Sequence, residues 1–214
     1  METFSTMEGA PVVRSIIDAI HENAGYLSEV DGAIGDGDHG VNMNKGFLMA
    51  GDRIKDDMTL SRALSVLSRT LVMDIGGSMG PIYGTLFSRL SKGLASKNVK
   101  ALEFSAALHG AIDGLKELAG AKEGDKTLID TIVPATHAFD IAVAKGFGLD
   151  RCLDALSQGA AEGRDSTREM IAKIGRASRL GERSRGHLDA GATSCCIILQ
   201  TLAKSLKPYI VMES

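Results

Sequence analysis

Apolar side chains recur at intervals of three or four residues along almost the whole chain of 214 residues. The first segment shows the pattern clearly, with Val13, Ile16, Ile17 and Ile20 followed by Leu27. This interval places apolar side chains on one face of an α-helix, whereas a half-buried strand would alternate apolar and polar residues. Similar segments follow at residues 43–50, 60–71, 82–90, 102–118, 128–143, 153–171 and 192–206. The pattern predicts about eight helices and no strand.

The connections between these segments are mostly short and contain glycine, as at residues 76–77, 93 and 146–148. Short connections make helices that follow one another in the sequence into antiparallel neighbours. We therefore expect an all-α fold in which about eight antiparallel helices form an up-and-down bundle or a closed barrel. Since no change of composition and no flexible linker divides the chain, residues 1–214 are expected to form a single domain.

Three acidic residues, Asp31, Asp36 and Asp38, lie within eight positions among several glycines, and no Lys or Arg occurs between residues 15 and 44. Two carboxylates about 4 Å apart repel by roughly 4 kcal/mol at an effective dielectric constant near 20, so a compact cluster of three indicates that a cation belongs between them. Oxygen ligands without cysteine favour Mg²⁺ over Zn²⁺. An EF-hand is excluded because Phe47 would take the place of its last glutamate. On this segment alone, solvated Asp-Gly turns remain an open alternative.

Two further segments are suited to an anionic ligand. Residues 76–81 place three glycines before an expected helix start, which exposes backbone N–H groups at the positive end of the helix dipole. Residues 175–193 form a long loop with four arginines, and long loops in compact domains are often functional. A sharp turn between helices would also explain the first segment. Capping of a helix by Asp125 or Thr127 is the simplest interpretation of residues 124–127.

The overall charge limits the kinds of partner. A formal net charge of -3 and a pI near 6.0 argue against nucleic acid. No stretch approaches the roughly 18 apolar residues of a membrane span, and the N-terminus has acidic residues where a secretion signal would be basic. Three cysteines, two of them adjacent, do not suggest a disulfide framework. We expect a cytoplasmic protein that binds a small molecule or another protein, with no nucleic acid and no membrane.

Four motifs, in a fixed order, cover most of the chain. They read DGAIGDGDHGVNM at residues 31–43, GGSMGPIYGT at 76–85, GDKT at 124–127 and GRASRLGERSRGHLDAGATS at 175–194. Each motif is weak alone, but together they resemble the nucleotide-binding L subunit of bacterial dihydroxyacetone kinases. The resemblance implies a closed barrel of eight antiparallel helices that holds ADP or ATP and two Mg²⁺ ions at one end.

The resemblance also implies roles for particular residues. Asp31, Asp36 and Asp38 would be the metal ligands. The residues implied to bind the nucleotide come from all four motifs: His39, Gly40, Asn42, Ser78, Met79, Gly80, Thr127, Leu128, Arg176, Asp189 and Gly191. Arg176 would in addition be catalytic, because its charge would neutralise the charge that builds on the transferred phosphoryl group.

The function implied by the resemblance is that of the ADP/ATP–Mg-binding subunit of a two- or three-component kinase. A separate K-type subunit would hold dihydroxyacetone or a related small ketose, and an M-type protein of the phosphotransferase system is a candidate phosphoryl donor. The alternatives are the nucleotide-binding domain of a fatty-acid-kinase-like system and a regulatory module that docks on a transcription factor. The sequence Asp38-His39-Gly40 favours the dihydroxyacetone branch over the first alternative. Three mutually repelling carboxylates favour chemistry over docking.

Overall fold

The structure is a computed structural model that describes residues 2–212. Helices account for most of these residues, and the prediction of an all-α fold is confirmed. The α-helices of the described range are α1 (Ala10–Glu22), α2 (Ala24–Gly32), α3 (His39–Gly51), α4 (Leu60–Asp74), α5 (Met79–Gly93), α6 (Ala101–Ala119), α7 (Ile129–Ala144), α8 (Leu149–Ser166) and α9 (Ala190–Leu206).

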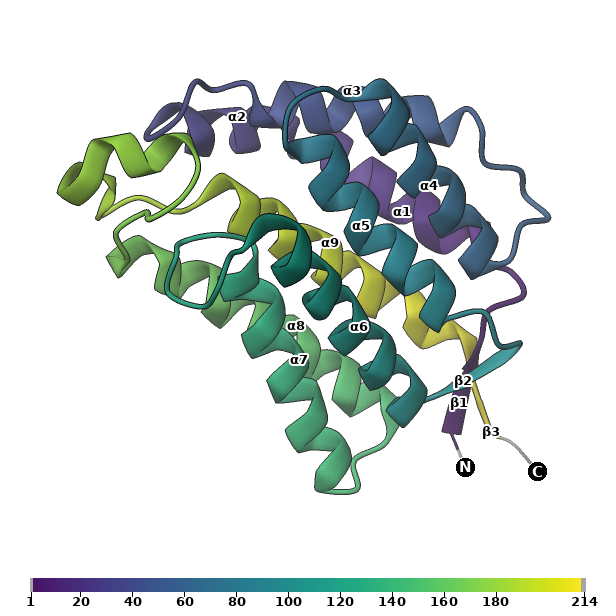
Figure 1. The fold of residues 1–214 in the computed structure, drawn as a ribbon. Coiled ribbons are helices and arrows are strands. Elements are labelled where there is room, and N and C mark those ends of the chain that lie inside the picture. Colours follow the sequence, from purple (N-terminus) through teal and green to yellow (C-terminus); the bar gives the residue numbers. More distant parts are fainter. Residues whose placement is uncertain (1, 213–214) are drawn as a thin grey trace.

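Eight of these helices form a closed ring (Figure 1). Each helix from α3 to α8 packs against the next one along the chain, and α1 closes the ring by contacting both α9 and α3. Most of their connections are short, which makes sequential neighbours antiparallel, whereas the connection between α8 and α9, residues 167–189, is long. The additional helix, α2, packs against α3 and α9. Within residues 2–212, no helix is both long and apolar enough to cross a bilayer.

A small antiparallel sheet closes one end of the barrel, so the expectation of no strand is wrong. Its strands are β1 (Glu2–Ser5), β2 (Asn98–Lys100) and β3 (Ile210–Met212), in the order β2-β1-β3. Phe4 of β1 lies opposite Val99 on one side and Ile210 on the other. Strands of three or four residues are too short to reveal an alternating pattern. They form because the barrel brings segments far apart in the sequence together.

Two helices end earlier than the apolar pattern indicates. Residues 13–27 were expected to form one helix, but the chain is interrupted at Asn23, whose side-chain amide donates to a carbonyl of α1 at 2.8 Å. The pattern after residue 153 extends to residue 171, whereas α8 ends at Ser166. There the hydroxyls of Ser166 and Thr167 donate to carbonyls of the last turn. Such side-chain bonds compete with the helical hydrogen bonds of the backbone.

The interior of the ring is apolar and is linked by aromatic contacts. Phe104 of α6 makes edge-to-face contacts with Phe4 at 5.6 Å and with Phe139 at 5.3 Å between ring centroids. Phe47 and Phe87 form a similar pair at 5.8 Å between α3 and α5. Since Phe4 belongs to β1, the same core extends from the helices to the sheet.

Helices α7 and α8 pack closely where glycine removes a side chain. A Cβ atom at Gly163 would collide with the Asp130 carbonyl oxygen and would lie 3.0 Å from the Thr131 Cα atom. We therefore predict that Gly163→Ala lowers the free energy of unfolding by about 1–3 kcal/mol, the usual cost of overpacking. Urea unfolding followed by far-UV circular dichroism measures this change.

The matched control is Gly110→Ala in the interior of α6, where a Cβ atom would meet no neighbour within 4 Å. This substitution should raise the free energy of unfolding by about 0.5–1 kcal/mol, because alanine is a better helix former than glycine. Equal stability of the two variants would contradict the close approach of α7 and α8.

Candidate functional site

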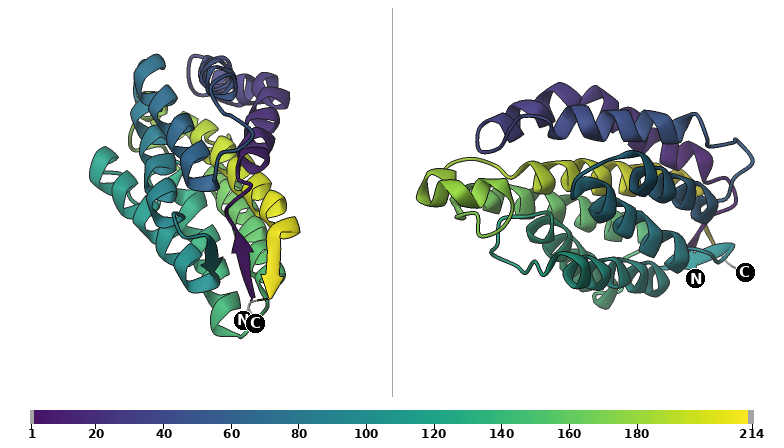
Figure 2. Two further views of the ribbon diagram at one scale, coloured as in Figure 1. Left: turned by 90° about the vertical axis from the view of Figure 1, so that its right-hand side faces the viewer. Right: turned by 45° about the horizontal axis from the view of Figure 1, so that its top comes forward.

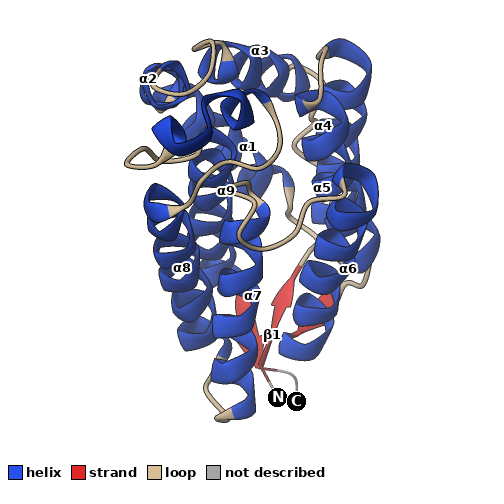
Figure 3. Cartoon of the chain, turned by 60° about the vertical axis from the view of Figure 1, so that its left-hand side comes forward, coloured by secondary structure: helices blue, strands red, loops and turns tan. Residues whose placement is uncertain are grey.

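Four connections meet at the end of the barrel opposite the sheet (Figure 3). They consist of residues 33–38, 75–78, 120–128 and 167–189. A cavity of about 570 Å³ opens between them, which is within the size range of small-molecule sites. Its lining residues come from all four motifs that the sequence analysis singled out.

The three acidic residues of the first motif gather at one side of this cavity. Carboxylate oxygens of Asp31, Asp36 and Asp38 all lie within 4.8 Å of one another. Asp31 belongs to the last turn of α2, and Asp38 directly precedes α3. Gly35 allows the chain to fold back, because a Cβ atom there would collide with the Asp31 side chain. The structure thus brings the predicted metal ligands together, and a set of hard oxygen donors fits Mg²⁺.

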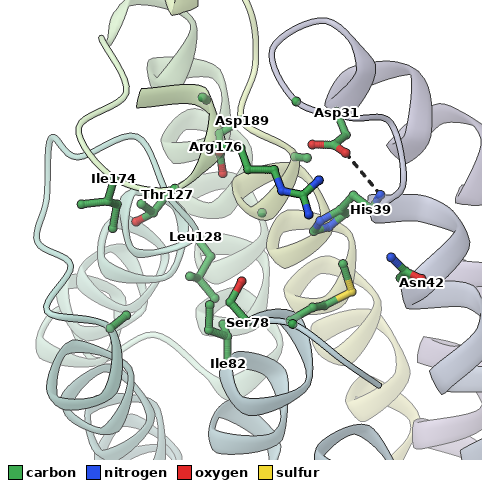
Figure 4. A pocket seen from close by; sticks show the side chains of 18 of the residues that line it. Asp31, His39, Asn42, Ser78, Ile82, Thr127, Leu128, Ile174, Arg176 and Asp189 are labelled. Atoms are coloured by element: carbon green, nitrogen blue, oxygen red, sulfur yellow. Dashed lines mark hydrogen bonds between the residues drawn. The ribbon is translucent and has the colours of Figure 1, made fainter. Parts of the chain in front are cut away.

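The long connection between α8 and α9 contributes one arginine to the cavity. Arg176 forms an ion pair with Asp36, and its guanidinium points into the cavity (Figure 4). The carboxylates therefore have a cationic neighbour, which comes from a distant part of the sequence. Arg179 lines an adjacent hollow together with Asp36 and Arg176, whereas Arg183 and Arg185 are exposed and line neither hollow.

His39 begins α3 and is held by a chain of hydrogen bonds. Its Nε2 atom lies 2.8 Å from the Ser194 hydroxyl, which lies 2.5 Å from the Tyr83 hydroxyl. Burial lowers the pKa of the His39 imidazole to about 4, although the Asp31 carboxylate opposes this shift. The imidazole is therefore neutral at neutral pH and adds no charge to the cavity. Asn42, one turn further along α3, also lines the cavity.

The start of α5 forms another part of the wall. The helix begins at Met79, after Gly77 in a left-handed conformation with φ at 71°, so Gly80 lies in its first turn and not before it as expected. Ser78 and Met79 line the cavity, and the Ser78 hydroxyl makes no capping bond to the helix. The N–H groups of the first turn lie where the helix dipole favours an anion.

Two of the glycines implied to bind the nucleotide lie behind the wall. Gly40 and Gly80 are buried, and neither lines the cavity. A Cβ atom at Gly40 would collide with the Ala24 carbonyl oxygen, and one at Gly80 with the carbonyl oxygens of Leu71 and Ile75. The two glycines allow α3 to approach α2 and α5 to approach α4, and their contact with a nucleotide stays a prediction.

The opposite wall is formed by residues before α7 and around the start of α9: Thr127, Leu128, Asp189 and Gly191. The Thr127 hydroxyl accepts a hydrogen bond from the Ile129 N–H at 3.2 Å, but the residue at the N-cap of α7 is Leu128, so neither Asp125 nor Thr127 occupies the capping position that was expected. The Asp189 carboxylate caps α9 by accepting from the Ala192 N–H at 2.7 Å. Burial raises the pKa of Asp189 to about 6, while this hydrogen bond and the Lys126 ammonium oppose the shift.

Comparison with known proteins identifies the family. Residues 33–204 match the family model of the DAK2 domain. The chain belongs to the DAK2 family. The DAK2 match includes every site residue named above except Asp31, which lies two residues before it.

Relatives of this DAK2 domain include subunits of bacterial kinases. The ADP-binding subunit of the PEP-dependent dihydroxyacetone kinase of Escherichia coli K12 is 36% identical over 194 residues, which cover 89% of this chain and 92% of the relative. A corresponding subunit from Listeria innocua is 33% identical, and the match covers 88% of this chain and 90% of that subunit. The L-erythrulose kinase of Pectobacterium atrosepticum is 29% identical, and the match covers 92% of this chain but 34% of that enzyme.

The DAK2 fold is also seen in a crystal structure. The dihydroxyacetone kinase of C. freundii in complex with AMP-PNP and Mg²⁺ matches with a TM-score of 0.66 and 22% sequence identity. The match covers 92% of this chain and 33% of that kinase, so this DAK2 domain spans about a third of its length. At this identity the likeness shows a shared fold.

Some residues that shape the site of this DAK2 domain were not found by sequence reasoning. Two of them, Tyr83 and Ser194, form the hydrogen bonds that hold His39. The other two are Lys126, in the connection between α6 and α7, and Asp130, in the first turn of α7. For Lys126 a signal exists in the sequence. A cation beside a helix N-terminus opposes the helix dipole, so a lysine in Gly124–Thr127 indicates a specific electrostatic partner.

Proposed function

We propose that this protein is the ADP/ATP–Mg-binding subunit of a kinase that transfers a phosphoryl group to dihydroxyacetone or a related small ketose held on a separate K-type subunit. The observation that carries the proposal is the convergence of Asp31, Asp36 and Asp38 beside Arg176 in one cavity. The E. coli and L. innocua relatives, each named as an ADP-binding subunit, support it. The erythrulose kinase relatives support a small ketose as the class of acceptor.

In this proposal Asp31, Asp36 and Asp38 hold two Mg²⁺ ions. When bound, Mg²⁺ neutralises phosphate charge and orients the phosphate oxygens. The three carboxylates suit this task because they converge from the two sides of a turn. Backbone carbonyl oxygens in this turn already accept hydrogen bonds, which leaves the carboxylates as the ligands. For example, the Asp31 carbonyl accepts from the Gly35 N–H at 2.6 Å.

The remaining wall residues would hold the nucleotide itself. The first turn of α5, at Ser78 and Met79, offers N–H donors to phosphate oxygens. The opposite wall, at Thr127 and Leu128, offers a surface for the adenosine, and Gly191 closes the site from the long connection. Arg176 would lie beside the transferred group, where a guanidinium stabilises the charge of an in-line displacement. The K-type partner must dock over this end of the barrel, because reacting oxygens must approach to about 3–3.5 Å.

We further propose that an M-type protein of the phosphotransferase system supplies phosphoryl groups to the bound ADP. The relatives named as PEP-dependent or PTS-dependent support this source. As part of such a system, the protein is proposed to act in the cytoplasm. The three buried free cysteines are consistent with a reducing compartment.

The purified chain alone, given ATP and Mg²⁺, should not phosphorylate dihydroxyacetone, because the carboxylates that would hold Mg²⁺ cannot also form an apolar, hydrogen-bonding pocket for a neutral triose. Addition of a K-type subunit from a relative should produce dihydroxyacetone phosphate, which a coupled dehydrogenase assay detects through NADH oxidation. Replacing ATP with ADP, phosphoenolpyruvate and phosphotransferase proteins tests the donor. Sustained ketose phosphorylation by the chain alone would overturn the proposal of a split enzyme.

A further inference from the structure

Lys126 occupies an unusual place in the connection between α6 and α7. Lys126 is only 2% exposed, although a lysine side chain normally reaches water. Its φ of 64° makes it the one residue other than glycine with a positive φ among residues 2–212. A left-handed conformation is unfavourable for a residue with a Cβ atom and persists only where surrounding contacts impose it.

The contacts that impose it are three hydrogen bonds from the ammonium group. The Lys126 Nζ atom donates to the carbonyl oxygens of Met170, Ser184 and His187 at 3.2, 2.6 and 2.7 Å. An ammonium has three N–H donors, so all of them are used. The lysine is therefore not available as a direct phosphate ligand, although it lines the cavity.

All three acceptors belong to one segment, residues 170–187, which we call the cover loop. Arg176 lies within the cover loop, between the first acceptor and the other two. The Lys126 side chain thus contacts both ends of the loop that carries Arg176. Burial lowers the pKa of the Lys126 ammonium, while the Asp189 carboxylate opposes this shift and acts as its counter-charge.

The backbone around Lys126 is itself fixed. The Asp130 carboxylate accepts from the Gly124 N–H at 2.5 Å and from the Thr127 N–H at 2.8 Å. The Asp125 carboxylate accepts from the Lys122 N–H at 2.9 Å. These bonds brace the turn on both sides of Lys126, so the ammonium is presented to the cover loop from a rigid base.

We propose that Lys126 is a positioning residue that fastens the cover loop through its three carbonyl contacts and thereby holds Arg176 at the mouth of the cavity. The fastening of the loop is independent of any reaction. Its consequence for phosphoryl transfer rests on the function proposed above.

Limited proteolysis of the full chain without nucleotide or partner tests the fastening. Trypsin cleaves after lysine and arginine, and the cover loop offers Lys173, Arg176, Arg179, Arg183 and Arg185. Lys126→Met should raise the rate of cleavage at these residues by about tenfold or more, because cleavage follows the population of the opened loop once charge-assisted hydrogen bonds are lost. Mass spectrometry identifies the cleaved bonds.

Two further variants make this result specific. Lys126→Gly removes the ammonium but accepts a positive φ without strain, so it separates loss of the contacts from misfolding and should be cleaved as fast as Lys126→Met. Lys122→Met, at an exposed lysine of the same connection, should be cleaved at the wild-type rate. Wild-type cleavage of the cover loop in Lys126→Gly would overturn the proposal.

A kinetic comparison tests the positioning of Arg176. With a K-type subunit present, Lys126→Gly should lower kcat about tenfold or more while changing the Kd for MgADP much less, because Arg176 is expected to act on developing charge. Fast cleavage with an unchanged kcat would overturn the positioning role. If the wild-type chain transfers no phosphoryl group at all, the proposed function fails, but the proteolysis still decides whether Lys126 fastens the loop.

Discussion

Replacing Asp38 or Asp36 with asparagine is expected to abolish Mg²⁺-dependent binding of ADP at ordinary nucleotide concentrations. A carboxylate about 4 Å from one unit of positive charge contributes roughly 4 kcal/mol at an effective dielectric constant near 20. Losing this attraction corresponds to a loss of affinity on the order of 10³-fold. Isothermal titration calorimetry with ADP in the presence and absence of Mg²⁺ measures the change in Kd.

The two variants should differ in stability. Asp38→Asn removes one of three converging charges and should leave the metal-free protein as stable as the wild type or slightly more stable. Asp36→Asn also removes the ion pair with Arg176. The loss of this attraction offsets the relief of repulsion, so this variant should gain less stability than Asp38→Asn. Asp113→Asn, at an exposed position of α6, is the matched control and should bind MgADP normally. Undiminished affinity in both cluster variants would refute the metal assignment.

Arg176→Ala is expected to lower kcat for phosphoryl transfer by about 10²–10³-fold, the usual cost of removing one preorganised group that stabilises transition-state charge. The Kd for MgADP should change far less, because only interactions stronger in the transition state raise the rate. The ion pair with Asp36 strengthens this expectation. Without the guanidinium, a metal ion no longer competes with it for that carboxylate.

The assay combines kcat, measured with a K-type subunit, and Kd, measured by calorimetry on the same preparations. Arg183→Ala is a suitable control because Arg183 lies in the same loop but is exposed and lines neither hollow. Equal losses of kcat and of nucleotide affinity in Arg176→Ala would instead assign Arg176 to ground-state binding.

Features that depend on local sequence could be predicted well. The helices could be predicted because residues three and four apart lie on the same face of a helix, and the buried face is apolar in every turn. The acidic cluster could be found because Asp31, Asp36 and Asp38 lie within a single turn and its flanking helices.

Features that depend on distant partners could not be predicted from the residues themselves. The sheet exists because Phe4 meets Val99 and Ile210 across most of the chain length. The partner of Asp36 is Arg176, and the partners of Lys126 are backbone carbonyls. A carbonyl group is present in every residue, so no side-chain pattern marks the positions that accept from the lysine.

The pairing of β1 with β3 determines where anything attached to this chain would go. Glu2 lies opposite Met212, so the two ends of the described chain emerge side by side (Figure 2), at the end of the barrel away from the cavity. A tag, a surface tether or a fused neighbouring domain joined at either end would extend away from the cover loop. The chain can therefore be immobilised through one end with the cavity facing solution. This orientation is suited to measuring the binding of a K-type subunit by surface plasmon resonance.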